Sequence, residues 1–188
     1  MDTPNTPPNT QTAPVSNPDT KPTRIVIMLP TNAYFMSGIR DFVMSFVKNA
    51  TSFSEQWAFR FQSIVDELCN NAIEHGSSPG QDIKLTLTYH PGDCMEIAVE
   101  DTGTGKTKRT AAEIQKATEE KRKPGYVHSG IRGRGLSGII FGWSDEVKIS
   151  DIQNGGIMVT AKKKLTADIP QSANAAAGKD PTHLVLTV

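Results

Sequence analysis

The residues best suited to chemistry lie at the end of one predicted helix, in the run Glu67-Leu-Cys-Asn-Asn-Ala-Ile-Glu-His-Gly76. Glu67 and Asn71 are four residues apart, so they lie about 40° apart around a helix and share one face. The carboxamide oxygen of Asn71 is a hard, neutral ligand of the kind that Mg²⁺ takes beside phosphates and water. Glu67 could then orient or deprotonate an attacking hydroxyl or water. The alternative is that the pair forms the wet face of an amphipathic helix.

A second candidate group follows a predicted strand, in the run Glu100-Asp-Thr-Gly-Thr-Gly105. Asp101 is placed to accept a hydrogen bond from an adenine amino group, and Gly103 and Gly105 let the backbone approach a ligand closely. A strand that ends in Asp-Thr-Gly is also an ordinary turn, so this motif alone leaves both interpretations open.

A third group, Arg132-Gly-Arg-Gly-Leu136, comes directly before a predicted helix. Glycines and free N–H groups at a helix N-terminus form a site that suits a triphosphate. Basic side chains nearby can add charge-assisted contacts to its phosphates. The candidate phosphate contacts are Lys106, Arg132, Gly133, Arg134, Gly135 and Leu136.

The run Gly103-Thr-Gly-Lys-Thr107 also imitates the end of a P-loop. That motif requires a glycine at position 100, where this chain has Glu100. Glu100 and Asp101 would, in addition, place two carboxylates beside the phosphates. A P-loop is therefore disfavoured.

Hydrophobic periodicity predicts the elements that must position these groups. The expected elements are a strand at 24–29, a helix at 35–47, the motif helix from the N-cap Ser54 to Gly76, a hairpin of strands 83–89 and 95–99, a third helix at about 135–142, and a hairpin of strands 146–149 and 156–161 across Asn154-Gly155. This order predicts an α+β fold, a two-layer sandwich of a mixed, mainly antiparallel sheet with helices on one face.

Three segments lack an apolar pattern. Residues 1–22 hold six of the twelve prolines and are expected to form a disordered Pro/Thr-rich tail. Residues 166–188 are expected to form a loose C-terminal tail. The single domain is expected to lie between the two tails, over residues 23–165. Residues 106–131 are polar and charged, which predicts a mobile lid with a helical turn or two near 111–120.

Composition and charge exclude several classes of protein. Lys plus Arg and Asp plus Glu both number 20, so no global field draws the chain to nucleic acid or to anionic lipid. No apolar run reaches the roughly 18 residues of a membrane span, and no signal-peptide pattern begins the chain, so we expect a cytoplasmic protein. Cys69 and Cys94 lie in apolar surroundings without C-x-x-C spacing, which favours buried thiols over a disulfide or a zinc site.

Three patterns follow one another along the chain: E-x-x-x-N-A-x-x-H-G, then D-x-G-x-G after a hairpin, then G-x-G-L opening a helix. In this order they resemble the N, G1 and G2 boxes of the GHKL (histidine-kinase-like) ATPases, over roughly residues 24–165. We expect neither the dimerising hairpin of histidine kinases nor the transducer domain of gyrase in a chain of this length. The compact serine/threonine kinases that act as bacterial anti-sigma factors are the most similar members. The segments that carry this similarity are Ser37–Phe46, Val65–Ala72, Gly133–Ile140 and Asp145–Lys148.

The resemblance implies that the protein binds ATP·Mg²⁺ and transfers the γ-phosphoryl group to a serine or threonine of a STAS-type antagonist. It further implies binding of a sigma factor or another output protein, and homodimer formation as in related kinases. The residue roles that the resemblance implies are Glu67 as the catalytic carboxylate, Asn71 as the Mg²⁺ ligand, Asp101 as the adenine contact, Gly103, Gly105, Gly133 and Gly135 as nucleotide-binding glycines, and Arg40 as a partner contact.

Two other functions compete with the kinase. One is a nucleotide-sensing binding module with weak or no kinase activity, and the other is an ATPase or kinase subunit of a different multi-component signalling system. The complete set of Glu67, Asn71 and Asp101 favours the active kinase. The long charged lid departs from the family pattern, and this departure puts recognition of the usual partner in question.

Overall fold

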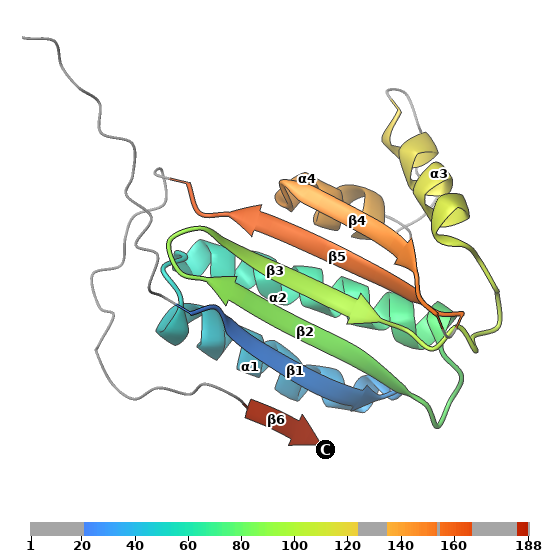
Figure 1. The fold of residues 1–188 in the computed structure, drawn as a ribbon, viewed down its shortest axis with the longest axis horizontal. Helices are drawn as coiled ribbons and strands as arrows, with labels where there is room; N and C mark the ends of the chain where they lie inside the picture. Colours follow the sequence, from blue (N-terminus) through green and yellow to red (C-terminus); the bar gives the residue numbers. More distant parts are fainter. Residues whose placement is uncertain (1–20, 124–134, 154, 167–183, 188) are drawn as a thin grey trace, which may run out of the picture.

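A single sheet of six strands forms one layer of the molecule in the computed structural model, which describes residues 21–123, 135–153, 155–166 and 184–187. The strand order is β4-β5-β3-β2-β1-β6 (Figure 1). Neighbouring strands are antiparallel except β1 and β6, which run parallel. The strands are β1 Thr23–Pro30, β2 Asp82–His90, β3 Cys94–Glu100, β4 Glu146–Asp151, β5 Ile157–Lys164 and β6 Leu184–Thr187. The predicted mixed, mainly antiparallel sheet is confirmed.

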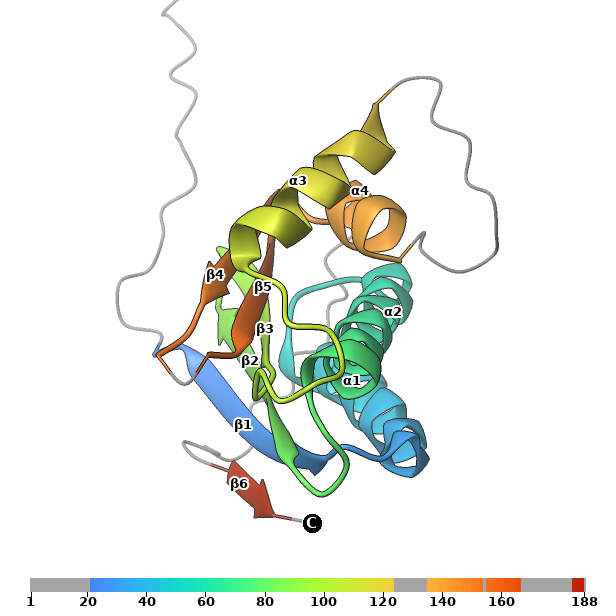
Figure 2. The ribbon, with the colours of Figure 1, turned by 90° about the vertical axis from the view of Figure 1, so that its right-hand side faces the viewer.

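The second layer is helical, and its two long helices, α1 and α2, lie side by side along one face of the sheet (Figure 2). The helical segments are η1 Ala33–Phe35, α1 Met36–Ala50, α2 Glu55–Asn71, η2 Ala72–Gly76, α3 Ala111–Arg122, η3 Gly135–Ile140 and α4 Phe141–Trp143. This arrangement confirms the predicted α+β sandwich. Within the described ranges, no helix combines the length and the apolar character that a membrane crossing requires.

The core lies between the sheet and these two helices. Residues of β1 alternate between buried and partly exposed positions, as expected for a strand with one face on the core. The apolar stripe of α2, which includes Phe61, Val65 and Leu68, is buried against that face. Full burial of one such side chain contributes about 1.5 to 3 kcal/mol. The stripe therefore fixes the rotation of α2 about its axis, and with it the direction in which the polar face of the helix points.

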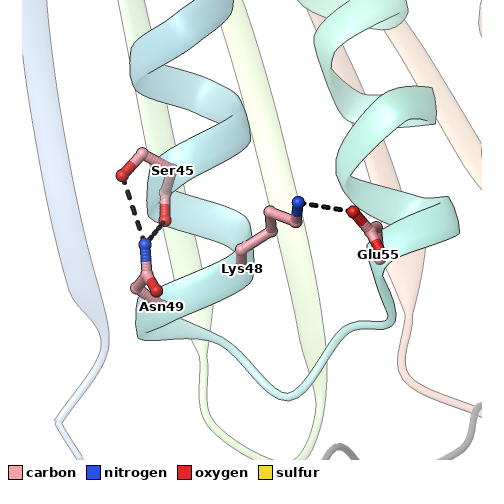
Figure 3. A network of polar contacts seen from close by, with 4 residues as sticks. All are labelled: Ser45, Lys48, Asn49 and Glu55. Atoms are coloured by element: carbon pink, nitrogen blue, oxygen red, sulfur yellow. Dashed lines mark hydrogen bonds and ion pairs between the residues drawn. The ribbon is translucent and has the colours of Figure 1, made fainter.

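Polar contacts lie where α1 ends and α2 begins (Figure 3). Lys48 Nζ lies 2.5 Å from Glu55 Oε1, and Asn49 Nδ2 donates to the Ser45 carbonyl at 2.8 Å. Exposed ion pairs of this kind contribute at most about 1 kcal/mol. Phe53, which is almost fully buried in the turn between α1 and α2, contributes more to holding the two helices together.

The charged segment that was predicted to be a lid contains a longer helix than expected. Residues Ala111–Arg122 form α3, of 12 residues, where the sequence predicted only a turn or two. Thr110 Oγ1 accepts from the Glu113 N–H, and the Glu113 carboxylate accepts from the Thr110 N–H, which is a capping box. The N–H of Ala111 also donates to Asp151 Oδ1 at 2.9 Å, which ties α3 to β4. Because the apolar face of α3 is narrow, the hydrophobic periodicity of the sequence did not indicate the full length of this helix.

The C-terminal end of the chain adds a strand that the sequence analysis did not predict. Residues Leu184–Thr187 form β6 and pair with β1. The expected third helix is confirmed as η3 followed directly by α4. Predictions that fall on 1–20, 124–134, Asn154, 167–183 and 188, among them the second part of the expected lid, lie outside the described residues.

Candidate functional site

The end of α2 presents the first pair of candidate residues together. Asn71 Nδ2 donates to Glu67 Oε1 at 3.1 Å, and both residues are partly buried. The contact confirms that the two side chains share a helix face. Because the amide nitrogen of Asn71 is turned toward Glu67, the carboxamide oxygen is the atom left to meet a cation, and an oxygen donor of this kind suits Mg²⁺.

The helix changes its geometry immediately after Asn71. Residues Ala72–Gly76 form the π-helical turn η2, which the sequence analysis expected as a continuation of the α-helix. Such wider turns inside helices occur frequently at functional sites. Here the turn carries the chain from Asn71 to Gly76, which contacts the second motif.

Asp101 follows the end of β3, and its carboxylate is held by the backbone. Oδ1 accepts hydrogen bonds from the N–H groups of Gly103 and Ile157, both at 2.9 Å. The Asp101 N–H in turn donates to the Ile157 carbonyl at 3.0 Å. Burial raises the pKa of Asp101 above its ordinary value, and the two backbone hydrogen bonds oppose that rise. The carboxylate is therefore fixed in orientation and partly removed from water.

Glycines allow the end of α2 and the loop after β3 to meet backbone to backbone. A Cβ on Gly76 would lie 2.2 Å from Asp101 Oδ2, and a Cβ on Gly105 would lie 1.9 Å from the His75 carbonyl oxygen. Gly103 has a φ of +64°, and a Cβ there would lie 2.0 Å from the Gly155 carbonyl oxygen. The Gly105 N–H donates to the Gly76 carbonyl at 3.2 Å. Two of the three motifs are thus brought into direct contact.

Hydroxyl side chains strengthen this junction, and the sequence analysis missed them. Ser77 Oγ accepts from the Thr102 N–H at 3.1 Å, and Thr104 Oγ1 accepts from the Ser78 N–H at 2.9 Å. Ser78 Oγ also donates to the Thr104 carbonyl. Hydroxyl residues directly follow Gly76 and alternate with the glycines after Asp101, but their contacts depend on how the two loops fold against each other.

The third motif is described only in part. Gly135 opens η3, which packs against α2, and Leu136 is partly buried against the core. Lys106 is exposed, on the loop that leads from the Asp101 motif toward α3. Arg132, Gly133 and Arg134 lie outside the described residues. The helix of the third motif therefore borders the same helix that carries Glu67 and Asn71.

Arg40 and His75 both have partners within the chain. Arg40 Nη1 lies 3.5 Å from Asp66 Oδ1, which joins α1 to α2. His75 is exposed, and its Nε2 lies 4.0 Å from a carboxylate oxygen of the neighbouring Glu74. The contact of Arg40 is an interhelical ion pair within the chain, and its predicted contact with a partner protein stays a prediction.

Both cysteines are buried free thiols, as predicted. Burial raises the pKa of Cys69 to about 12 and that of Cys94 to about 11. Thiols with such values are protonated at neutral pH, so neither is a nucleophile for the chemistry of this site.

A family model described as the histidine kinase-like ATPase domain matches residues 29–163. The match covers well over half of the chain and contains the Glu67–Asn71 pair, the Asp101 loop and the start of η3. No curated protein matches the chain.

Proposed function

Because this chain belongs to the histidine kinase-like ATPase family, we propose that it is an ATP-dependent serine/threonine protein kinase that acts as an anti-sigma factor. Its substrate would be a STAS-type antagonist, and its second partner a sigma factor or another output protein. The observation that carries the proposal is the contact between the helix end bearing Glu67 and Asn71 and the glycine loop bearing Asp101. In the proposed roles, this contact would bring a base, a cation ligand and an adenine acceptor toward one place.

The nucleotide would be held by groups of different chemistry. Asp101 Oδ2 would accept a hydrogen bond from the adenine amino group, since Oδ1 is already occupied by two backbone N–H groups. The carboxamide oxygen of Asn71 would hold Mg²⁺, which neutralises charge on the phosphates when bound. Lys106 and the phosphate-binding residues before η3 would contact the γ-phosphate.

Glu67 would act on the attacking hydroxyl of the partner. The hydroxyl oxygen forms a bond to the γ-phosphorus, and the bond from that phosphorus to the β–γ bridging oxygen breaks, so that ADP leaves. The hydroxyl proton passes to the Glu67 carboxylate. Partial burial and the Asn71 amide hold this carboxylate in place.

Incubation with radiolabelled ATP and candidate antagonist proteins tests this function. The wild-type chain should label a serine or threonine of one antagonist. Glu67→Ala should keep ATP affinity within a few fold, while transfer falls about 10²- to 10⁴-fold, the usual scale for loss of an acid–base group. Glu74→Ala is the matched control, because Glu74 is exposed on the adjoining turn and should transfer normally.

Two outcomes would count against the role of Glu67, and a third against the kinase itself. An equal loss of binding and transfer in Glu67→Ala would make Glu67 structural. Unchanged transfer in this variant would remove it from the chemistry. ATP binding by the wild type without transfer to any antagonist would favour the nucleotide-sensing module.

A further inference from the structure

A group of metal-ligating side chains lies at the turn between β2 and β3. His90 ends β2, and Cys94 begins β3 directly opposite it in register. Glu96 follows two residues later, so its side chain leaves the same face of the sheet as Cys94. One His90 ring nitrogen, Cys94 Sγ and one Glu96 carboxylate oxygen all lie within 4.8 Å of one another.

This group is separate from the nucleotide site. Cys94 begins β3 and Asp101 follows the end of the same strand, so at about 3.3 Å per residue the two positions are roughly 20 Å apart. The turn and the Asp101 loop are therefore at opposite ends of the strand. A cation held at the turn would not be the one that accompanies ATP.

The donors of this group of three suit zinc, because one thiolate, one imidazole and one carboxylate are ligands that zinc takes in proteins. Asp93 lies beside the group, where Cys94 Sγ donates a hydrogen bond to its Oδ2 at 3.4 Å. Cys94 loses this hydrogen bond when its thiol proton leaves on metal binding.

The positively charged ammonium group of Lys162 already lies beside these ligands. Lys162 on β5 lies opposite Glu96 in register, and its Nζ is 3.1 Å from Glu96 Oε1. The ammonium group neutralises the carboxylate that a metal ion would need. Lys162 and a metal ion would therefore compete for Glu96.

We propose that His90, Cys94 and Glu96 form a site for a zinc-class divalent ion that clips the β2–β3 hairpin. Binding forms a metal–sulfur bond and releases the thiol proton of Cys94 to solvent. Binding also displaces Lys162 from Glu96. The two cysteines do not share this site, because Cys69 lies on α2, and the cysteine spacing therefore gave no sign of it.

Cobalt(II), added without nucleotide to the chelator-treated full chain, is the spectroscopic probe. We expect a thiolate-to-cobalt charge-transfer band at one ion per chain. Zn²⁺ should abolish this band by displacing cobalt, and at a hundredfold excess over its Kd it should raise the Tm by about 5 to 10 °C. Added chelator should reverse the rise in Tm.

Variants of the cluster identify the ligands. Cys94→Ser, a near-isosteric change, should lose the charge-transfer band. His90→Gln should bind cobalt at least about 10-fold more weakly. Mutation of a residue that only supports a metal ligand already weakens metal binding by about that much. Cys69→Ala is the matched control and should keep both the band and the rise in Tm. Lys162→Met should bind cobalt more tightly, because the competing ammonium is gone.

Specific results would overturn the site. If the wild-type chain shows no charge-transfer band with cobalt and has the same Tm in Zn²⁺ and in chelator, the metal site is excluded without the need for any variant. A band that persists in Cys94→Ser but disappears in Cys69→Ala would place the metal elsewhere. Unchanged or weaker cobalt binding by Lys162→Met would contradict the competition. None of these results depends on kinase activity.

Discussion

The two carboxylate oxygens of Asp101 have different surroundings. Oδ1 accepts from two backbone N–H groups, and Oδ2 lies against Gly76. In Asp101→Asn the two N–H groups favour an oxygen at the Oδ1 position. The amide nitrogen is then directed to the Oδ2 position, where the adenine amino group would arrive. This substitution preserves the loop and reverses the hydrogen-bonding character of the proposed contact.

The raised pKa of Asp101 predicts how the stability of the fold changes with pH. A raised pKa means that the folded chain disfavours the ionised carboxylate, so this group destabilises the fold at neutral pH and ceases to do so as pH falls through the raised pKa. Asp101→Asn should therefore have a higher Tm than wild type at pH 7. The difference should shrink on acidification. Calorimetric scans across pH measure it, and a difference that grows toward acid pH would reverse the assigned sign.

Gly76 gives a second prediction. Gly76→Ala would press a Cβ against the Asp101 carboxylate, and overpacking of this kind costs about 1 to 3 kcal/mol. Both the Tm and the affinity for ATP should fall. Gly38→Ala on α1 is the matched control, since nothing lies within 4 Å of its Cβ and alanine stabilises a helix by about 0.5 to 1 kcal/mol relative to glycine. Equal ATP affinity in the two variants would contradict the close contact.

At the scale of elements, the sequence predicted those whose apolar faces are wide. The strands of both hairpins and the helices α1 and α2 were predicted within a few residues of their bounds, because burial imposes a clear period on their sequences. Three elements were not predicted from the sequence, or were predicted only in part. The π-helical turn η2 keeps nearly the same side-chain pattern as an α-helix, α3 buries only Ala111 and Thr118, and β6 is a four-residue edge strand.

The segment from Lys106 onward should respond to the γ-phosphate. Its first residues are exposed, whereas α3 is capped and tied to β4, so trypsin should cut at Lys106, Lys108 and Arg109 before it cuts within α3. We expect ATP·Mg²⁺ to slow this cleavage, because phosphates can order basic loops, and ADP to slow it less. Time courses of digestion followed by mass spectrometry measure the rates. Equal rates with ATP, ADP and no nucleotide would rule out a lid that senses the γ-phosphate.

At the scale of the whole molecule, one helix joins the candidate groups. The polar face of α2 carries Glu67 and Asn71, its π-turn meets the Asp101 loop, and its side packs against η3. The order of the motifs in the sequence predicted this convergence. The hydroxyl contacts of Ser77 and Ser78, and the metal-ligating group at the far end of β3, could not be predicted in this way. They depend on loop geometry and on strand register, which no local period encodes.

If ATP binds where the end of α2 meets the Asp101 loop, isothermal titration of the full chain with ATP·Mg²⁺ should detect it. Wild type should bind one ATP per chain. Asp101→Asn should bind roughly 10- to 100-fold more weakly, since the loss of a hydrogen bond to a charged group costs about 1.5 to 3 kcal/mol. The variant should nevertheless remain folded, with the higher Tm at pH 7 that the raised pKa of Asp101 predicts. Equal ATP affinity in the two proteins would contradict binding at this place.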